Sequence, residues 1–570
     1  MIKKTLSKTL KILLLLLCIA AAVGTFWLIT GNSAKGDSVA GFEYYHYDIS
    51  KFDEKCEELE SAVKADDADA VIKLYDELYA ECEEVETLYA AAYVLYSTDM
   101  DDEYYSDEQE YSYTTLEKCE DKLCTICHDI ALSSSADAFK EHVGEDAFAG
   151  FKDYEPYTDR DWELIEKEQK LVDEYYDLYT DPDLTCEYNG TVWDLDMLDG
   201  SEGDELYETD TDGYYIVADE IEKKFNEKGG PIFKELVDLR NEFAQLHGYD
   251  NYAVYADEVE YTRDYSDADI TLLHKSVKKN SKAFIPLYYD FYMSTGEDLP
   301  VMSNKELLDI LCTYSDETGS VAGQAAAILK DDNLYSIDDG KSRQPGGYTI
   351  YLPKVEKPFI FITNDDAENT LPTLTHEFGH FTEDINDSRS NALTDSDNID
   401  LAEIASNGFE CLMTHYYDEI FDDQADQARK EIITELMENV IYGCIEDEFQ
   451  RAVYKNPDMT LDEMNNLYGK INAEYGIGSG GRDYSWVFVT HTFEQPMYYI
   501  SYAVSGLAAL QIWSQSNTDF DGAVKTWESF LEEGIYNKTY LDVVGRCGLI
   551  KFNKQGAVDE ICKPALDAFR

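Results

Sequence analysis

The chain has 570 residues, more than one hydrophobic core normally serves, so we expect at least two subdomains. Hydrophobic residues make up 44% and aromatic residues 13%, which excludes an intrinsically disordered acidic protein. With 46 Lys and Arg against 118 Asp and Glu, the net charge of −72 repels nucleic acid and anionic lipid. We therefore expect a folded acidic protein with no nucleic-acid partner.

The first 38 residues differ from the rest in being basic and apolar. Four Lys precede a 19-residue apolar run from Ile12 to Thr30. A secretory signal has an apolar region of about 7–15 residues, whereas a membrane-spanning helix needs about 20. Residues 1–38 therefore predict a cytoplasmic Lys-rich tail, a single-pass signal anchor and a linker. They place the rest of the chain on the extracytoplasmic side of the cell membrane. Two alternatives are cleavage near Ser38–Ala40, which would give a secreted protein, and lipidation at Cys18.

Residues 39–205 are predicted to form an N-terminal helical domain. From 44 to about 170, apolar positions recur every three or four residues among acids, a pattern typical of amphipathic helices. The turn-rich stretch 178–213 indicates an insertion or a short hairpin. Cys124 and Cys127 form a CxxC, which we interpret as free thiols because no second CxxC completes a metal site.

Residues 206–570 are predicted to form the catalytic domain, again mainly helical. Two strand-like stretches, 346–351 and 358–363, alternate in polarity and suit a short hairpin or an edge strand. Helical patterning resumes at Leu371 and continues to the end of the chain. The expected architecture is therefore mainly α, with a small β-sheet directly before the segment that carries the chemistry.

That segment is His376-Glu377-Phe378-Gly379-His380. On a helix, residues four apart share a face, so the imidazoles of His376 and His380 can reach one zinc ion. Glu377 would lie beside the metal, where a carboxylate can take a proton from water. With 9 His in the chain, a chance HExxH is expected on the order of 0.01 times. The segment therefore predicts a catalytic zinc site with Glu377 as general base.

A catalytic zinc site needs a third protein ligand. The next helical pattern contains Glu403, which lies 27 residues after His376, enough for a turn and a packed antiparallel helix. Its apolar neighbours distinguish it from the solvated acids of this chain. Glu410 lies two helical turns further along the same face, where it can hold a ligand imidazole from outside the coordination sphere.

These segments resemble the thimet oligopeptidase/oligoendopeptidase F family of zinc metallopeptidases, over about residues 215–530. In that family an HEFGH helix is followed by a segment like Asp400-Leu-Ala-Glu403-Ile-Ala-Ser406. The resemblance implies one zinc ion per chain, held by His376, His380 and Glu403. It also implies an elongated multi-helix metallopeptidase with a deep substrate channel and a small sheet beside the HExxH helix.

Two further segments match the family. Gly346, Gly347 and Tyr348 match its strand along the substrate backbone, which implies a substrate-binding role. The segment 491–503 matches a region of His and Tyr side chains that face the zinc.

The chemistry of peptide hydrolysis supports the second match independently. Attack on a peptide carbonyl places negative charge on its oxygen, which phenol or imidazole donors stabilise. Tyr499 and Tyr502 are three apart and share a helix face, and His491 precedes them, so all three are candidate catalytic residues. We interpret Tyr498 as a packing residue.

We therefore predict a monomeric zinc metalloendopeptidase, an oligopeptidase that acts on short peptides. An exopeptidase of carboxypeptidase type with the same fold is the first alternative. A non-catalytic surface protein that binds peptides is the second, and the complete set of candidate residues argues against it.

Overall fold

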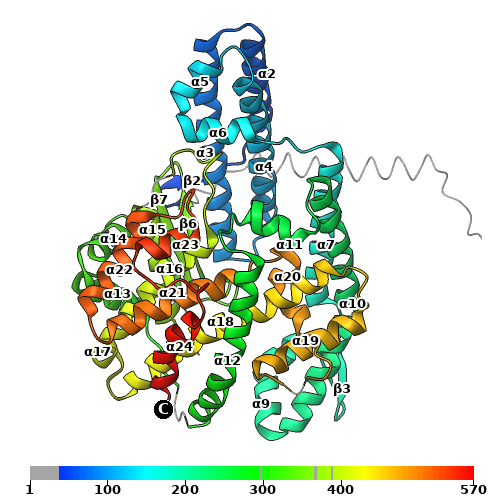
Figure 1. Cartoon of the computed structure of the whole chain (residues 1–570), viewed down its shortest axis with the longest axis vertical. Helices are drawn as coiled ribbons and strands as arrows, with labels where there is room; N and C mark the ends of the chain where they lie inside the picture. The colour runs from blue at the N-terminus through cyan, green and yellow to red at the C-terminus, as the bar shows by residue number, and fades with distance from the viewer. Residues whose placement is uncertain (1–37, 295–297, 365–368, 387–388, 479) are drawn as a thin grey trace, which may run out of the picture.

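The computed structural model describes residues 38–294, 298–364, 369–386, 389–478 and 480–570. Helices make up most of it and the strands are short, so the predicted mainly α fold is confirmed. Figure 1 shows an elongated molecule in which a narrow arm stands above a broader body.

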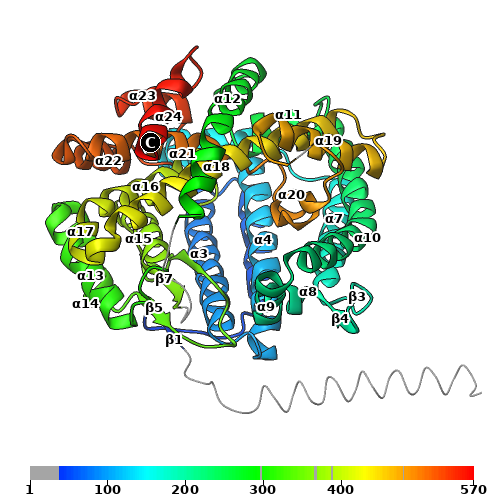
Figure 2. The same ribbon diagram turned by 90° about the horizontal axis from the view of Figure 1, so that it is seen from below.

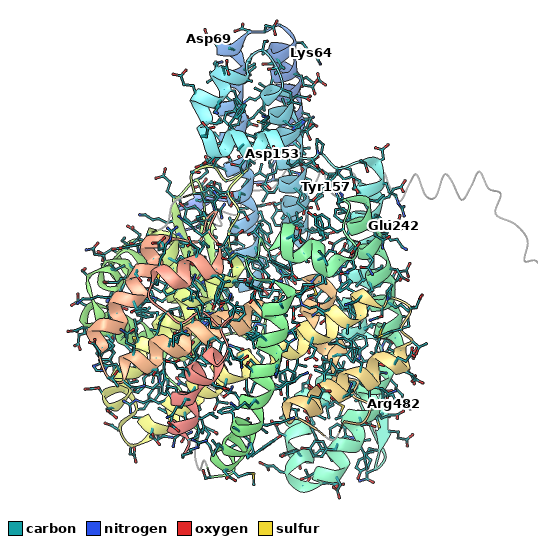
Figure 3. The ribbon with its side chains drawn as sticks, in the orientation of Figure 1. Lys64, Asp69, Asp153, Tyr157, Glu242 and Arg482 are labelled. Atoms are coloured by element: carbon teal, nitrogen blue, oxygen red, sulfur yellow. The ribbon has the colours of Figure 1, made fainter. Side chains whose placement is uncertain are left out.

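Residues 38–153 build the arm and the middle of the body. The elements are β1 (Ser38–Val39), β2 (Phe42–Glu43), α2 (Ser50–Lys64), α3 (Ala68–Thr98), α4 (Glu103–Ala131), α5 (Ala136–Val143) and α6 (Glu145–Asp153). Apolar residues recur at helical spacing along α3, which therefore buries one side against α4. Lys64 and Asp69 lie at the tip of the arm, where α2 turns into α3 (Figure 3). Cys124 and Cys127 are buried free thiols on α4, as expected.

A second group of elements forms the lobe on the right of Figure 1. It contains α7 (Asp159–Tyr176), β3 (Cys186–Tyr188), β4 (Thr191–Trp193), α8 (Leu195–Asp199), α9 (Ser201–Thr209) and α10 (Thr211–Leu246). β3 and β4 pair as the short hairpin that the turn-rich stretch predicts. Asn189 and Gly190 connect them with φ angles of 51° and 86°, which an Asn-Gly pair adopts readily.

The small sheet has three strands in the order β5-β7-β6. β5 (Tyr335–Asp338) pairs parallel with β7 (Lys357–Thr363), and β6 (Gly347–Leu352) pairs antiparallel with β7. The predicted β6–β7 hairpin is therefore confirmed, whereas β5 is an addition, because four residues are too few to establish an alternating pattern. β6 lies at the edge of the sheet, and α3 of the arm packs against it. In the described part of the chain no strand pairs with its outer side.

The remaining helices surround this sheet and fill the lower body. They are α11 (Tyr252–Tyr255), α12 (Asp267–Tyr292), α13 (Asn304–Thr318), α14 (Ser320–Asp331), α15 (Leu371–Asn386), α16 (Ile399–Met413), α17 (Tyr417–Phe421), α18 (Ala425–Lys455), α19 (Leu461–Tyr475), α20 (Thr490–Glu494), α21 (Ile500–Ser516), α22 (Phe520–Glu533), α23 (Tyr540–Arg546) and α24 (Ala557–Ala568). α15 packs on β6 and β7, α16 packs on α15, and α21 lies between α16 and α18. Figure 2 shows α3 and α4 in the middle of the molecule, with α15 and α16 on one side and α7 and α10 on the other.

The predicted membrane anchor at Ile12–Thr30 lies outside the described residues. Among the helices that the structure does describe, none is long and apolar enough to cross a membrane. The longest, α10 with 36 residues, carries acidic and basic side chains along its whole length, whereas a spanning helix needs about 20 mostly apolar residues. This finding contradicts the prediction of a membrane-anchored protein with an extracytoplasmic catalytic domain, and we withdraw the membrane as a partner.

Candidate metal centre and catalytic cavity

The HExxH segment lies on α15, where α15 crosses α16 at very close range. A Cβ atom on Gly379 would lie 2.4 Å from the Cα atom of Ser406 and 2.6 Å from the carbonyl oxygen of Ala405. Any larger residue at this position would push the two helices apart. The glycine between the two histidines therefore sets the distance at which side chains of α16 approach them.

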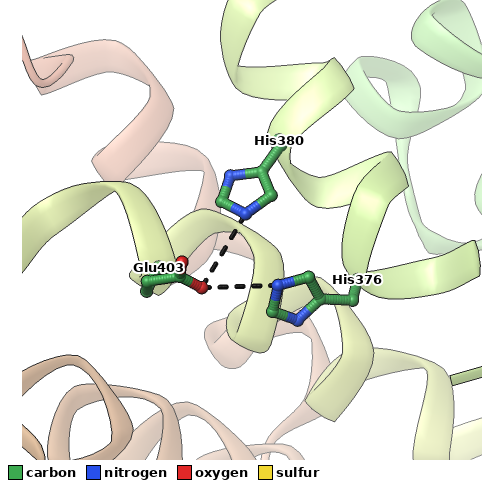
Figure 4. A group of neighbouring side chains, drawn as sticks. All are labelled: His376, His380 and Glu403. Carbon is green, nitrogen blue, oxygen red and sulfur yellow. Dashed lines mark ion pairs between the residues drawn. The ribbon is translucent and has the colours of Figure 1, made fainter. Parts of the chain in front are cut away.

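At this crossing three side chains of types that can bind a metal converge, as Figure 4 shows. The Nε2 atom of His376 lies 3.3 Å from the Oε2 atom of Glu403, and Nε2 of His380 lies 3.7 Å from the same oxygen. The three possible ligand atoms all lie within 4.8 Å of one another, and the described residues contain no other group of this kind. Two imidazole nitrogens and one carboxylate oxygen are a donor set of catalytic zinc sites, so these residues fit the ion.

Neighbouring groups orient this cluster. Oε2 of Glu410 lies 3.6 Å from Nδ1 of His376, which turns the Nε2 atom of that ring toward Glu403. Burial opposes ionisation of Glu403, but its contacts with His376 and His380 outweigh burial and lower its pKa to about 2. Ser406 also donates to Glu403, over 3.2 Å. The carboxylate is therefore held ionised, as a metal ligand must be.

Glu377 lies between the histidines and strand β6. The hydroxyl of Thr349 donates to its Oε2 atom over 3.0 Å and to its backbone carbonyl over 2.8 Å. Thr349 was not predicted from the sequence. It lies two residues after Gly347 and so falls on the same face of the strand, and this alternation is the one signal that could have found it.

These residues line a cavity of about 880 Å³. Side chains of α3, β6, α15, α16 and α18 form its walls, so it lies beside the base of the arm. Tyr348 lines it, and its hydroxyl donates to Ser97 of α3 over 2.9 Å. Gly346, directly before β6, and Gly347, its first residue, are not among the lining residues of the described chain. A Cβ atom on Gly347 would lie 2.4 Å from Cδ1 of Ile362, so a larger residue there would require the Ile362 side chain to move.

The predicted His and Tyr side chains gather on the opposite wall. Tyr499 and Tyr502 line the cavity, and so does Tyr498, which we had assigned to packing. His491 lies behind them on α20, with its Nε2 atom 3.5 Å from the Tyr502 hydroxyl. Burial lowers the pKa of His491, which favours the neutral imidazole.

Two further lining residues carry charge and were not predicted. Arg389 is the one Arg or Lys among the lining residues of the described chain, and it pairs with Glu86 over 2.8 Å. Glu435 of α18 faces the cavity, and the nearby charge of Glu410 together with burial raises its pKa to about 8. Neither residue belongs to a recognisable motif, because each reaches the cavity from a separate part of the chain.

Comparisons with known proteins agree with this arrangement. The Peptidase M3 N-terminal domain matches residues 40–153. A solved structure provisionally named oligoendopeptidase F is 21% identical with a TM-score of 0.74, covering 93% of this chain and 98% of that one. PZ peptidase A with an inhibitor is also 21% identical, with a TM-score of 0.73 and the same coverage.

A third structure, provisionally named oligoendopeptidase F from Bacillus anthracis, is 19% identical with a TM-score of 0.72 and covers 94% of this chain and 98% of that chain. At these identities the similarity establishes the fold. No curated protein sequence matches the chain. The domain match over residues 40–153 and the shared fold support the resemblance to the thimet oligopeptidase/oligoendopeptidase F family that the HExxH helix followed by Glu403 indicates.

Proposed function

We propose that this protein is a zinc-dependent oligopeptidase that cleaves peptide bonds within short peptides, with one zinc ion per chain. The observation that carries the proposal is the convergence of His376, His380 and Glu403 beside Glu377, in the wall of a cavity. When bound, zinc would supply a Lewis acid that polarises the peptide carbonyl and makes water a nucleophile at neutral pH.

The chain's own residues supply the proton transfers. Glu377 would accept the proton of the attacking water and later deliver it to the leaving amine. Thr349 donates to the same carboxylate, which fixes its direction toward the cavity. Glu410 would keep the ring of His376 in place from behind.

The opposite wall would stabilise the developing charge on the carbonyl oxygen. The hydroxyl of Tyr502 points into the same cavity as the metal ligands and is a neutral donor, since burial raises its pKa well above the ordinary range. His491, close to that hydroxyl, would orient it, and Tyr499 would supply a second donor.

Strand β6 would hold the substrate. Its outer edge faces the cavity through Tyr348 and Thr349, and an extended peptide can add to such an edge through backbone hydrogen bonds. Backbone recognition of this kind accepts many sequences, as a general oligopeptidase requires.

The test is hydrolysis of a quenched fluorescent peptide by the Glu377→Gln variant. We expect kcat to fall about 10²–10⁴-fold with the metal content unchanged, because the base is lost and the ligands remain. Glu419→Gln, at an exposed position of α17, makes the same chemical change away from the cavity and should leave kcat unaltered. Wild-type kcat in Glu377→Gln would remove this residue from the mechanism.

One observation favours the exopeptidase alternative. Arg389 is placed in the cavity wall, where a guanidinium can bind the carboxylate of a peptide's C-terminus. Peptides with blocked and with free ends separate the two functions. Equal cleavage of an acetylated, amidated peptide supports an endopeptidase, whereas a strict need for a free C-terminus supports the carboxypeptidase type.

A further inference from the structure

A second groove, of about 1010 Å³, lies between α12 and α18 and shares no lining residue with the catalytic cavity. It is unusual for this acidic chain because basic side chains dominate its lining. They are Lys275, Lys278, Lys279, Lys282, Arg451 and Lys455.

The four lysines of α12 follow the spacing of one helix face. They stand at positions i, i+3, i+4 and i+7, so they form a row about 10 Å long at 1.5 Å per residue. The opposite face of α12 is buried through Leu273 and Val277. Like charges three and four apart destabilise a helix, so this row carries a cost that the fold itself does not require.

Three of the six basic side chains that line the groove already form ion pairs with carboxylates of the chain. Lys278 pairs with Glu448 and Glu474 over 2.7 Å each, and Lys279 pairs with Asp559 over 2.6 Å. The guanidinium of Arg451 binds Asp257 and Asp447. These contacts fix the positions of three basic side chains.

The other half have no such partner. The ammonium groups of Lys275, Lys282 and Lys455 make no ion pair or hydrogen bond with any side chain in the part of the chain that the structure describes. All three side chains are exposed, and all three line the groove. Three positive charges without an ion pair therefore surround one concave surface of a protein whose net charge is −72, and only that of Lys282 is partly offset, by nearby Glu474.

The groove also limits the size of its ligand. Asp250, Asp267 and Glu448 lie among the lysines, and together with the overall negative charge they would repel a long polyanion. A small anion with two or three phosphate groups can instead reach the free ammonium groups while avoiding those acids. We propose that this groove binds a compact polyphosphorylated small molecule, held by Lys275, Lys282 and Lys455.

The test is calorimetric titration of the full chain with inorganic tripolyphosphate at low salt. We expect micromolar binding that weakens at least tenfold in the triple variant Lys275→Gln/Lys282→Gln/Lys455→Gln. The matched control is Lys152→Gln/Lys341→Gln/Lys525→Gln, which removes the same charge from exposed positions outside the groove and should change Kd less than twofold.

Two outcomes would overturn the proposal. Equal weakening in both triple variants would assign the binding to net charge alone, and no detectable binding would leave the groove without a ligand of this class. Tripolyphosphate also chelates metals, so metal content is measured before and after each titration. Binding that survives in the groove variant and disappears in His380→Ala would place the anion at the metal centre and would also contradict the proposal.

Discussion

Asp400 and Glu403 lie one helical turn apart on α16, yet the chain surrounds them in opposite ways. Asp400, 1% exposed, lies 3.5 Å from the guanidinium of Arg263 and accepts hydrogen bonds from Ser501 over 2.7 Å and Tyr265 over 2.8 Å. Glu403 faces two imidazole rings and no Lys or Arg side chain within ion-pair distance in the described chain.

The difference separates a structural carboxylate from a candidate metal ligand. A guanidinium is always charged, so Arg263 completes the environment of Asp400 without any added ion. A metal ion binds an imidazole in its neutral form, whose nitrogen lone pair would then point at the same place as the carboxylate. An external cation is what such a cluster lacks, and burial makes that need stronger.

The Asp400 cluster extends far beyond one pair. Arg263 also binds Asp257 over 2.8 Å, Asp257 binds Arg451 over 2.5 Å, and Arg451 binds Asp447 over 2.8 Å. The series thereby connects α16, α18 and the segment after α11. Every acid in it has an arginine from the chain itself, whereas the Glu403 cluster has none.

The largest effect should come from exchanging the two acids for amides. In Glu403→Gln we expect near-complete loss of bound zinc, because a neutral amide replaces the anionic ligand. In Asp400→Asn we expect close to one zinc ion per chain, with reduced stability. Metal analysis of both purified variants checks this, and equal zinc retention would show that Glu403 is not a ligand.

Breaking the arginine series should affect stability instead of metal binding. Arg263→Met leaves Asp257 and Asp400 partly uncompensated in the interior, which costs about 3–5 kcal/mol of unfolding free energy. Arg482 forms an exposed pair with Asp462 over 3.1 Å and lies on the surface in Figure 3. Arg482→Met should therefore cost at most about 1 kcal/mol. Denaturant unfolding of the two variants measures the difference in unfolding free energy. A similar loss of unfolding free energy in both variants would contradict the prediction.

Glu446 of α18 tests what happens when a buried acid has neither arginine nor metal. It is 1% exposed, accepts a hydrogen bond from Tyr468 over 2.5 Å, and burial raises its pKa to about 8. Its folded pKa exceeds the unfolded value, so its stabilising contribution is complete below about pH 4.5 and is lost as pH rises toward 8.

Glu446→Gln removes this titration while keeping the acceptor for Tyr468. The stability of the wild type relative to the variant should fall between pH 5.5 and 7.5, by at most about 1.4 kcal/mol per pH unit. Unfolding free energies of both proteins across that range provide the check. Parallel pH profiles would mean that Glu446 is ionised in the folded protein.

The sequence predicts the chemistry better than it predicts the cavity. The sequence alone is enough to propose His376, Glu377 and His380, because helical spacing places them side by side without knowledge of the rest of the fold. Thr349 reaches Glu377 across 28 residues of sequence, and Glu435 comes from a different helix, so no local pattern identifies them. The hairpin β6–β7 is predictable from alternation, whereas the parallel partner β5 is too short. The membrane anchor, predicted from an apolar run after four Lys, is contradicted, since no described helix could cross a membrane.

The smallest expected effect is a preference for basic over acidic peptides, which the acids in the outer parts of the catalytic cavity would produce. The described lining residues include the acids Glu86, Glu383, Asp384 and Asp397 and one Arg, Arg389, which pairs with Glu86. A low-dielectric cleft focuses such a field, whereas charges on the open surface are screened within about 8 Å at physiological salt.

A bound metal ion would oppose this negative field at the centre of the cavity. The preference for basic side chains should therefore concern the substrate residues on either side of the scissile bond. We expect a peptide with Lys there to exceed its Glu counterpart in kcat/KM by about three- to tenfold at low salt, since charge pairs near a wet surface contribute about 1 kcal/mol. The ratio should shrink as salt rises, because salt screens the charges that line the cavity. A peptide with Gln at the same position gives the neutral reference. Equal kcat/KM for the Lys and Glu peptides at low salt would mean that the acids of the lining are compensated as fully as Asp400 is, and that the charge serves solubility alone.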